Sequence, residues 1–119
     1  MKNLKSIGRY LFTIPFALFG LMHLMMANDM AGLVPSWLPG GVFWVYVTGL
    51  ALIAAGVSFV IQKHTYLAGL LTAALMLVFV FTIHLPAMIG GDMMAMSGLL
   101  KDLGLAGGAL MLASNYQQD

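Results

Sequence analysis

Two of the three histidines in this 119-residue chain, His23 and His84, lie within long apolar stretches, each near the same end of its stretch. An ionisable side chain at membrane depth is costly and is usually kept for a function. Two imidazoles at one depth on separate helices could ligate a haem axially or bind a transition metal. Alternatively, each histidine simply forms a hydrogen bond near the lipid headgroups.

An aromatic stripe leads to the first of these histidines. Phe12, Phe16, Phe19 and His23 are separated by four, three and four residues. At this spacing they share one face of a helix. Such a face could line a cleft for a flat hydrophobic ligand such as a quinone. The alternative is a packed helix face whose histidine bonds to a backbone carbonyl.

Methionines gather at the same end of the apolar stretches. Thioethers prefer Cu(I), so Met22 and Met26 together with His23 and His84 are candidate copper ligands. Methionine is equally an adaptable packing residue. Eight of the eleven methionines lie at this end: Met22, Met25, Met26, Met30, Met88, Met93, Met94 and Met96.

Four charged residues, Asp29, Asp92, Lys101 and Asp102, surround the same region. With the histidines they could form a rim that polarises a ligand or exchanges protons; the alternative is that they are solvated charges at helix ends. The breaker-rich apolar segments 32–41 and 85–91 are expected to be loops that cover this region. The candidate ligand pocket therefore contains His23, His84, Phe16, Phe19, Trp37, Trp44, Asp29, Asp92 and Lys101.

The elements that must position these residues are membrane helices. The chain is 61% hydrophobic and only 8% charged, whereas a soluble domain carries about 25% charged residues. Apolar stretches of about 20 residues match the hydrocarbon thickness of a bilayer, where only helices satisfy their backbone groups from such runs. Short connections predict an all-α membrane protein with one domain over 1–119, an antiparallel up-down-up-down bundle of four transmembrane helices at about 4–26, 42–61, 67–84 and 93–113.

Charge asymmetry predicts the orientation of this bundle. Lys2, Lys5, Arg9 and Lys63 lie at the N-terminus or between the second and third helices. The positive-inside rule then places both termini in the cytoplasm and the paired histidines on the outer side of a bacterial inner membrane. Arg9 is expected to extend towards the inner headgroups. A net charge of +1 is too small for nucleic-acid binding, and the absence of cysteine removes thiolate chemistry.

Short motifs in this order resemble the DoxX family of small four-helix membrane proteins. They read FGLMH at 19–23, VPSWLP at 34–39, FWVYVTG at 43–49, HLP at 84–86 and KDLGLAGG at 101–108. The resemblance implies a four-helix membrane fold. It also implies a link to membrane redox complexes, such as the membrane subunits of sulfur-compound:quinone oxidoreductases.

These observations lead to one principal hypothesis and two alternatives. The principal hypothesis is a multi-pass protein that is accessory to, or a subunit of, a quinone-linked redox system and has an outer-side ligand pocket. The first alternative is a redox subunit that binds haem or copper. The second is a small transporter or a structural protein that forms homo-oligomers through its small-residue faces. The residues do not decide between a catalytic and a non-catalytic role.

Overall fold

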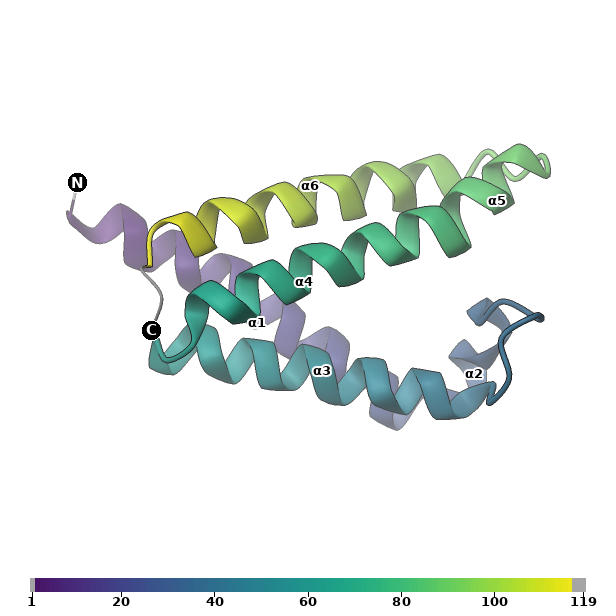
Figure 1. The fold of residues 1–119 in the computed structure, drawn as a ribbon, viewed down its shortest axis with the longest axis horizontal. Coiled ribbons are helices and arrows are strands. Elements are labelled where there is room, and N and C mark those ends of the chain that lie inside the picture. Colours follow the sequence, from purple (N-terminus) through teal and green to yellow (C-terminus); the bar gives the residue numbers. More distant parts are fainter. Residues whose placement is uncertain (1, 117–119) are drawn as a thin grey trace.

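The computed structural model describes residues 2–116, and this part of the chain is almost entirely helical (Figure 1). Four helical stretches are long and apolar enough to cross a membrane. Their apolar length makes helix the favoured state, because a helix satisfies its own backbone groups in lipid. The elements are α1 (Lys2–Met25), α2 (Ala27–Met30), a 3₁₀ turn (Ala31–Leu33), α3 (Val42–Ile61), α4 (Thr65–Phe79), a π-helical turn η2 (Val80–His84), α5 (Leu85–Ile89) and α6 (Ala95–Ser114).

The third long helix extends beyond its expected end at His84. The segment 85–91 was expected to be a loop, but α4, η2 and α5 form one continuous helical stretch, Thr65–Ile89. In η2 the backbone N–H of Leu85 donates to the carbonyl of Val80, five residues back. Pro86 then stands at the start of α5, where its missing N–H is tolerated. The expectation of a loop was wrong because the proline follows a π turn rather than ending the helix.

Consecutive long helices run in opposite directions and form two close pairs, α1 with α3 and α4 with α6 (Figure 1). Glycines allow the close approach within each pair. A Cβ atom on Gly49 would lie 2.8 Å from the Cβ of His23 and 2.9 Å from the carbonyl oxygen of Gly20. In the other pair, a Cβ on Gly69 would lie 2.7 Å from the Cβ of Ala113. Small residues serve this purpose in membrane helices, where packing rather than water exclusion drives association.

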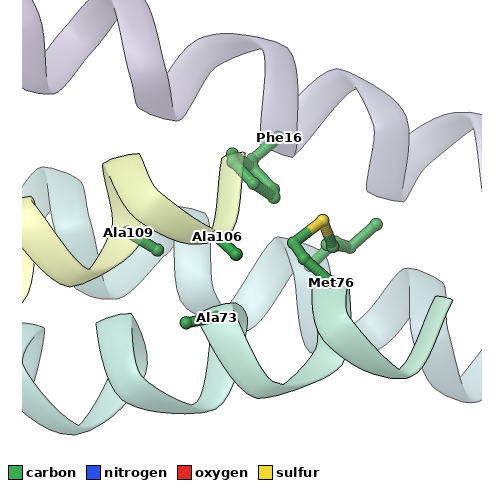
Figure 2. Close-up of a cluster of buried hydrophobic side chains, with 6 residues drawn as sticks. Phe16, Ala73, Met76, Ala106 and Ala109 are labelled. Atoms are coloured by element: carbon green, nitrogen blue, oxygen red, sulfur yellow. The ribbon is translucent and has the colours of Figure 1, made fainter. Parts of the chain in front are cut away.

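The two pairs meet at a small apolar core half-way along the helices. Figure 2 shows Phe16 of α1 beside Met76 and Ala73 of α4 and Ala106 and Ala109 of α6. Leu52 of α3 completes this buried cluster. From this core the pairs diverge towards the end that carries α2 and α5 (Figure 1).

The opposite end of the bundle is closed by polar contacts. Arg9 does not extend outwards as expected: it is buried, and its Nη1 donates to the carbonyls of Phe59 and Val60, both at 3.0 Å. A cation is favourable at the C-terminal end of a helix, where carbonyl groups lack partners within the helix. Lys5 also donates to the backbone carbonyl of Asn115 at 3.4 Å and so links the first turns of α1 to the end of α6.

Candidate functional site

A cavity of about 610 Å³ lies between the two diverging helix pairs. Its floor includes Phe16, Leu52 and Met76, which also belong to the apolar core. All four long stretches contribute to its sides, and the segment between α2 and α3 lines the far end. Its volume falls in the range of small-molecule sites. Seven of the nine residues predicted for the pocket line this cavity: His23, His84, Phe16, Phe19, Trp37, Trp44 and Lys101.

His84 lines the cavity in a hydrogen bond to an acid on α6. Its Nε2 lies 2.8 Å from Oδ2 of Asp102, whose side chain is only 6% exposed. A carboxylate can only accept, so Nε2 donates in this bond. Lys101 is a more distant partner of the same carboxylate, with 3.9 Å between its Nζ and Oδ1. The buried acid is thus hydrogen-bonded and flanked by a cation, as a buried charge requires.

Two backbone features give His84 its position. The π turn η2 holds one extra residue compared with an α-turn, and this changes the direction in which His84 leaves the helix. The imidazole then lies directly against Gly98 of α6: a Cβ there would be only 2.7 Å from its Nδ1 and Cε1 atoms. The absence of a side chain at Gly98 therefore makes room for the ring beside Asp102.

His23 faces the cavity from α1 and bonds to its own helix. Its Nδ1 lies 2.7 Å from the carbonyl oxygen of Phe19. Because a carbonyl only accepts, Nδ1 carries the hydrogen, and in the neutral ring Nε2 remains a hydrogen-bond acceptor. The alternative of a histidine bonded to a backbone carbonyl is confirmed for this contact, while the same ring lines the cavity.

Lys101 crosses from α6 towards α1. Its Nζ lies 5.2 Å from the centroid of the Phe19 ring, within the range of a cation–π contact. Its side chain is half-exposed, at 51%. Lys101 therefore borders the cavity on the α1–α6 side and can donate hydrogen bonds there.

The segment between α2 and α3 covers the far end of the cavity, as the sequence predicted for residues 32–41. Val34, Pro35 and Trp37 are among its lining residues. The segment is attached to α3 by the indole of Trp44, whose Nε1 donates to the carbonyl of Pro39 at 2.5 Å. The two tryptophans of the chain, Trp37 and Trp44, thus both line the cavity.

Four predicted site residues lie outside the cavity lining: Asp29, Asp92, Met22 and Met26. Asp92 instead accepts a hydrogen bond from the backbone N–H of Met94 at 3.1 Å, just before α6 begins. Met22 and Met26 are exposed. Within residues 2–116, no group of three or more His, Cys, Asp or Glu side chains could hold a metal ion. Haem or copper ligation by the histidines and methionines stays a prediction.

Asp102 and Gly98 belong to the site but were not among the nine residues predicted to line the pocket. Asp102 was predicted to belong either to a polar rim with the histidines or to the solvated charges at helix ends. The structure places it two turns inside α6, where it is 4% exposed. The sequence did contain a signal for Asp102, because an acid within an apolar helix is usually kept for a function. No sequence signal distinguishes Gly98, because its role depends on where the ring of His84 lies.

This arrangement can hold a molecule with an apolar body and a polar group. The walls offer apolar and aromatic side chains such as Phe16, while the histidines, Lys101 and Asp102 offer both donors and acceptors. Few polar groups within an apolar lining are typical of sites that bind and orient small ligands.

Comparison with known proteins corrects the family expected from the short motifs. Residues 12–106 match the family model described as Domain of unknown function (DUF8561), so the chain belongs to that family. The expectation of DoxX membership was wrong, because the match is to DUF8561. Glycine, tryptophan and proline near helix ends are common in helical membrane proteins in general, so short motifs of these residues do not by themselves show a family. No curated protein and no solved structure matches the chain.

Proposed function

Since the chain belongs to a family described only as a domain of unknown function, we propose a role from the cavity itself: binding of a lipid-soluble ring compound of the quinone type. The observation that carries this proposal is the cavity of about 610 Å³ between the helix pairs, with apolar walls and charged or titratable side chains from α1, η2 and α6. In this proposal the chain is accessory to a quinone-linked redox system: it binds the quinone, and a partner protein uses it.

The proposed setting is a bacterial inner membrane that the four long helices cross. The closed end carries Lys5, Arg9 and Lys63, so the positive-inside rule places that end in the cytoplasm. The cavity then faces the outer half of the bilayer, beneath the segment between α2 and α3. A lipid-soluble ligand can reach a site at this depth without passing through water.

The chemistry of the lining favours a flat ring with carbonyl oxygens. Phe16, Phe19 and Trp44 supply aromatic surface for stacking against such a ring. Lys101 supplies donors for a carbonyl oxygen, and the pair of His84 and Asp102 supplies an exchangeable proton. In this proposal the chain binds and orients the quinone, and electron transfer belongs to the partner protein.

The two tryptophans allow a direct binding test. Both line the cavity, and they are the only tryptophans in the chain. The purified protein, reconstituted in lipid nanodiscs, is titrated with decyl-benzoquinone, and tryptophan fluorescence is recorded. We expect saturable quenching. Thr48→Phe, which adds a ring to the cavity lining, should weaken binding about tenfold or more. Extraction of the purified protein should also recover a bound quinone.

Ala54→Phe is the matched control. Ala54 lies on the same helix as Thr48, but it is exposed and outside the cavity lining. This variant should keep the quenching curve of the unaltered protein. Quenching that rises linearly without saturation in all three proteins indicates collision in the bilayer and refutes the proposed function.

A further inference from the structure

We infer that the ligand is a long-tailed amphiphile whose tail leaves the cavity sideways, between α3 and α4, while its head stays among the polar side chains. This inference rests on the proposed function and adds the class of the ligand and its direction of entry. It follows from the unequal chemistry of the two sides of the cavity.

The charged and titratable side chains of the cavity come from α1, η2 and α6. They are His23 on α1, His84 on η2, and Lys101 and Asp102 on α6. The α3–α4 rim, defined as Val47 and Ala51 of α3 with Leu75 and Val78 of α4, is apolar. A ligand with a polar head and an apolar tail matches this division when its tail points to α3 and α4.

The α1–α6 side is bordered by the cation of Lys101 over the ring of Phe19, with 5.2 Å between Nζ and the ring centroid. An alkyl chain leaving there would have to pass the half-exposed ammonium group. Passage of an apolar chain beside a charge removes water or polar partners from that charge, which is costly. This side therefore suits the head of the ligand rather than its tail.

The α3–α4 rim is both part of the cavity lining and exposed on the outside of the bundle. Val47 is 38% exposed and Val78 is 52% exposed, although both line the cavity. The hydroxyl of Thr82, a neighbouring lining residue on η2, donates to the carbonyl of Val78 at 2.6 Å and so presents no free donor. The rim thus joins the cavity to the lipid through side chains as apolar as the lipid.

Such an opening explains how a cavity of about 610 Å³ serves a ligand longer than itself. Lipid tails are as apolar as leucine side chains, so an alkyl chain loses little by lying between α3 and α4 rather than in the bilayer. The cavity then needs to enclose only the ring. The tail stays in the membrane, and the ring enters from the side.

Photolabelling of the unaltered protein in nanodiscs tests the path of the tail. The probe is a decyl-benzoquinone with a diazirine at the end of its tail, and labelled peptides are identified by mass spectrometry. We expect labels on residues of α3 and α4 near the rim. Excess decyl-benzoquinone without the diazirine should suppress them. Labels concentrated on α1 and α6 overturn the inference.

A variant of the rim provides the second measurement. Ala51→Phe should weaken binding of decyl-benzoquinone about tenfold but leave binding of the tail-free benzoquinone head within about twofold. Ala54→Phe, outside the cavity on the same helix, should change neither. Equal losses for both compounds in Ala51→Phe overturn the tail path while the proposed function stands. Absence of saturable binding by either compound to the unaltered protein refutes the proposed function itself, and the tail path with it.

Discussion

Leucine substitutions of His84 and Asp102, made singly and together, measure how strongly η2 is held to α6. The two side chains share one hydrogen bond of 2.8 Å between helices of the same pair. His84→Leu leaves a carboxylate that is 6% exposed, and within residues 2–116 its remaining partner is the ammonium group of Lys101, 3.9 Å away. Asp102→Leu leaves the imidazole of His84, 20% exposed, without its acceptor. The double variant replaces both polar groups by apolar ones.

The two single variants should differ in their free energy of unfolding, because each leaves a different group without its partner. Leaving a buried charge without its partner costs about 3–5 kcal/mol, and the nearby Lys101 places the loss in His84→Leu near the lower end, at about 3 kcal/mol. Asp102→Leu leaves the imidazole donor of His84 without its acceptor and should cost about 1 kcal/mol. Replacing both groups by apolar residues is often nearly neutral. The coupling energy is the difference between the double variant and the two single variants together, so the cycle should give about 4 kcal/mol. This is above the average of about 0.6 kcal/mol for interhelical hydrogen bonds in a membrane protein.

The assay is reversible unfolding in mixed detergent micelles, with increasing sodium dodecyl sulfate and helicity followed by circular dichroism. Asp29→Leu is the control, because Asp29 lies on α2, exposed and outside the cavity lining. It should change the free energy of unfolding by no more than about 0.5 kcal/mol. A coupling energy below about 0.5 kcal/mol would refute the conclusion that this pair holds η2 against α6.

Two further substitutions test the packing that surrounds the site. Gly98→Ala places a Cβ 2.7 Å from the ring of His84, so it should lower the free energy of unfolding by about 1–3 kcal/mol in the same assay. Gly104→Ala is the control on the same helix. A Cβ there meets open space, so this variant should be neutral or stabilising by up to about 1 kcal/mol. Equal losses for both would contradict the close contact. Arg9→Met removes two hydrogen bonds to carbonyls at the C-terminal end of α3. It should lower the free energy of unfolding by about 2 kcal/mol. An unchanged unfolding midpoint would show that the buried guanidinium does not stabilise the fold.

The long helices could be predicted from the sequence with some accuracy. The second was expected at 42–61, and α3 spans Val42–Ile61. The apolar runs predict the positions of the helices because each helix satisfies its own backbone hydrogen bonds, whatever its neighbours are. The third helix was predicted to end at His84 but reaches Ile89 in the structure. Proline normally interrupts a helix because it lacks a backbone N–H and its ring clashes with the preceding turn. Here the π turn before Pro86 lets the helix continue.

The candidate site could be predicted in part, for reasons that differ between residues. The stripe of Phe16, Phe19 and His23 depends only on helical periodicity, and all three line the cavity. Asp29 and Asp92 were included because they lie near the same end of the helices, but proximity to an end does not determine which way a side chain faces. Both lie outside the lining.

The short motifs misled the prediction of family. Pro35, Trp37 and Gly49 stand where many membrane bundles need a breaker, an interfacial aromatic residue or a close contact. Their order alone therefore does not show a family, and the family that matches is DUF8561.

The sequence by itself determined that this chain forms long apolar helices and that two histidines come near the same end of the bundle. These properties follow from local composition and from helix rise, which need no knowledge of the partners. The tertiary structure decided that the helices pair as α1 with α3 and α4 with α6, and that a cavity opens between the pairs. It also decided that His84 meets Asp102, because that contact needs a π turn on one helix and a missing side chain at Gly98 on the other.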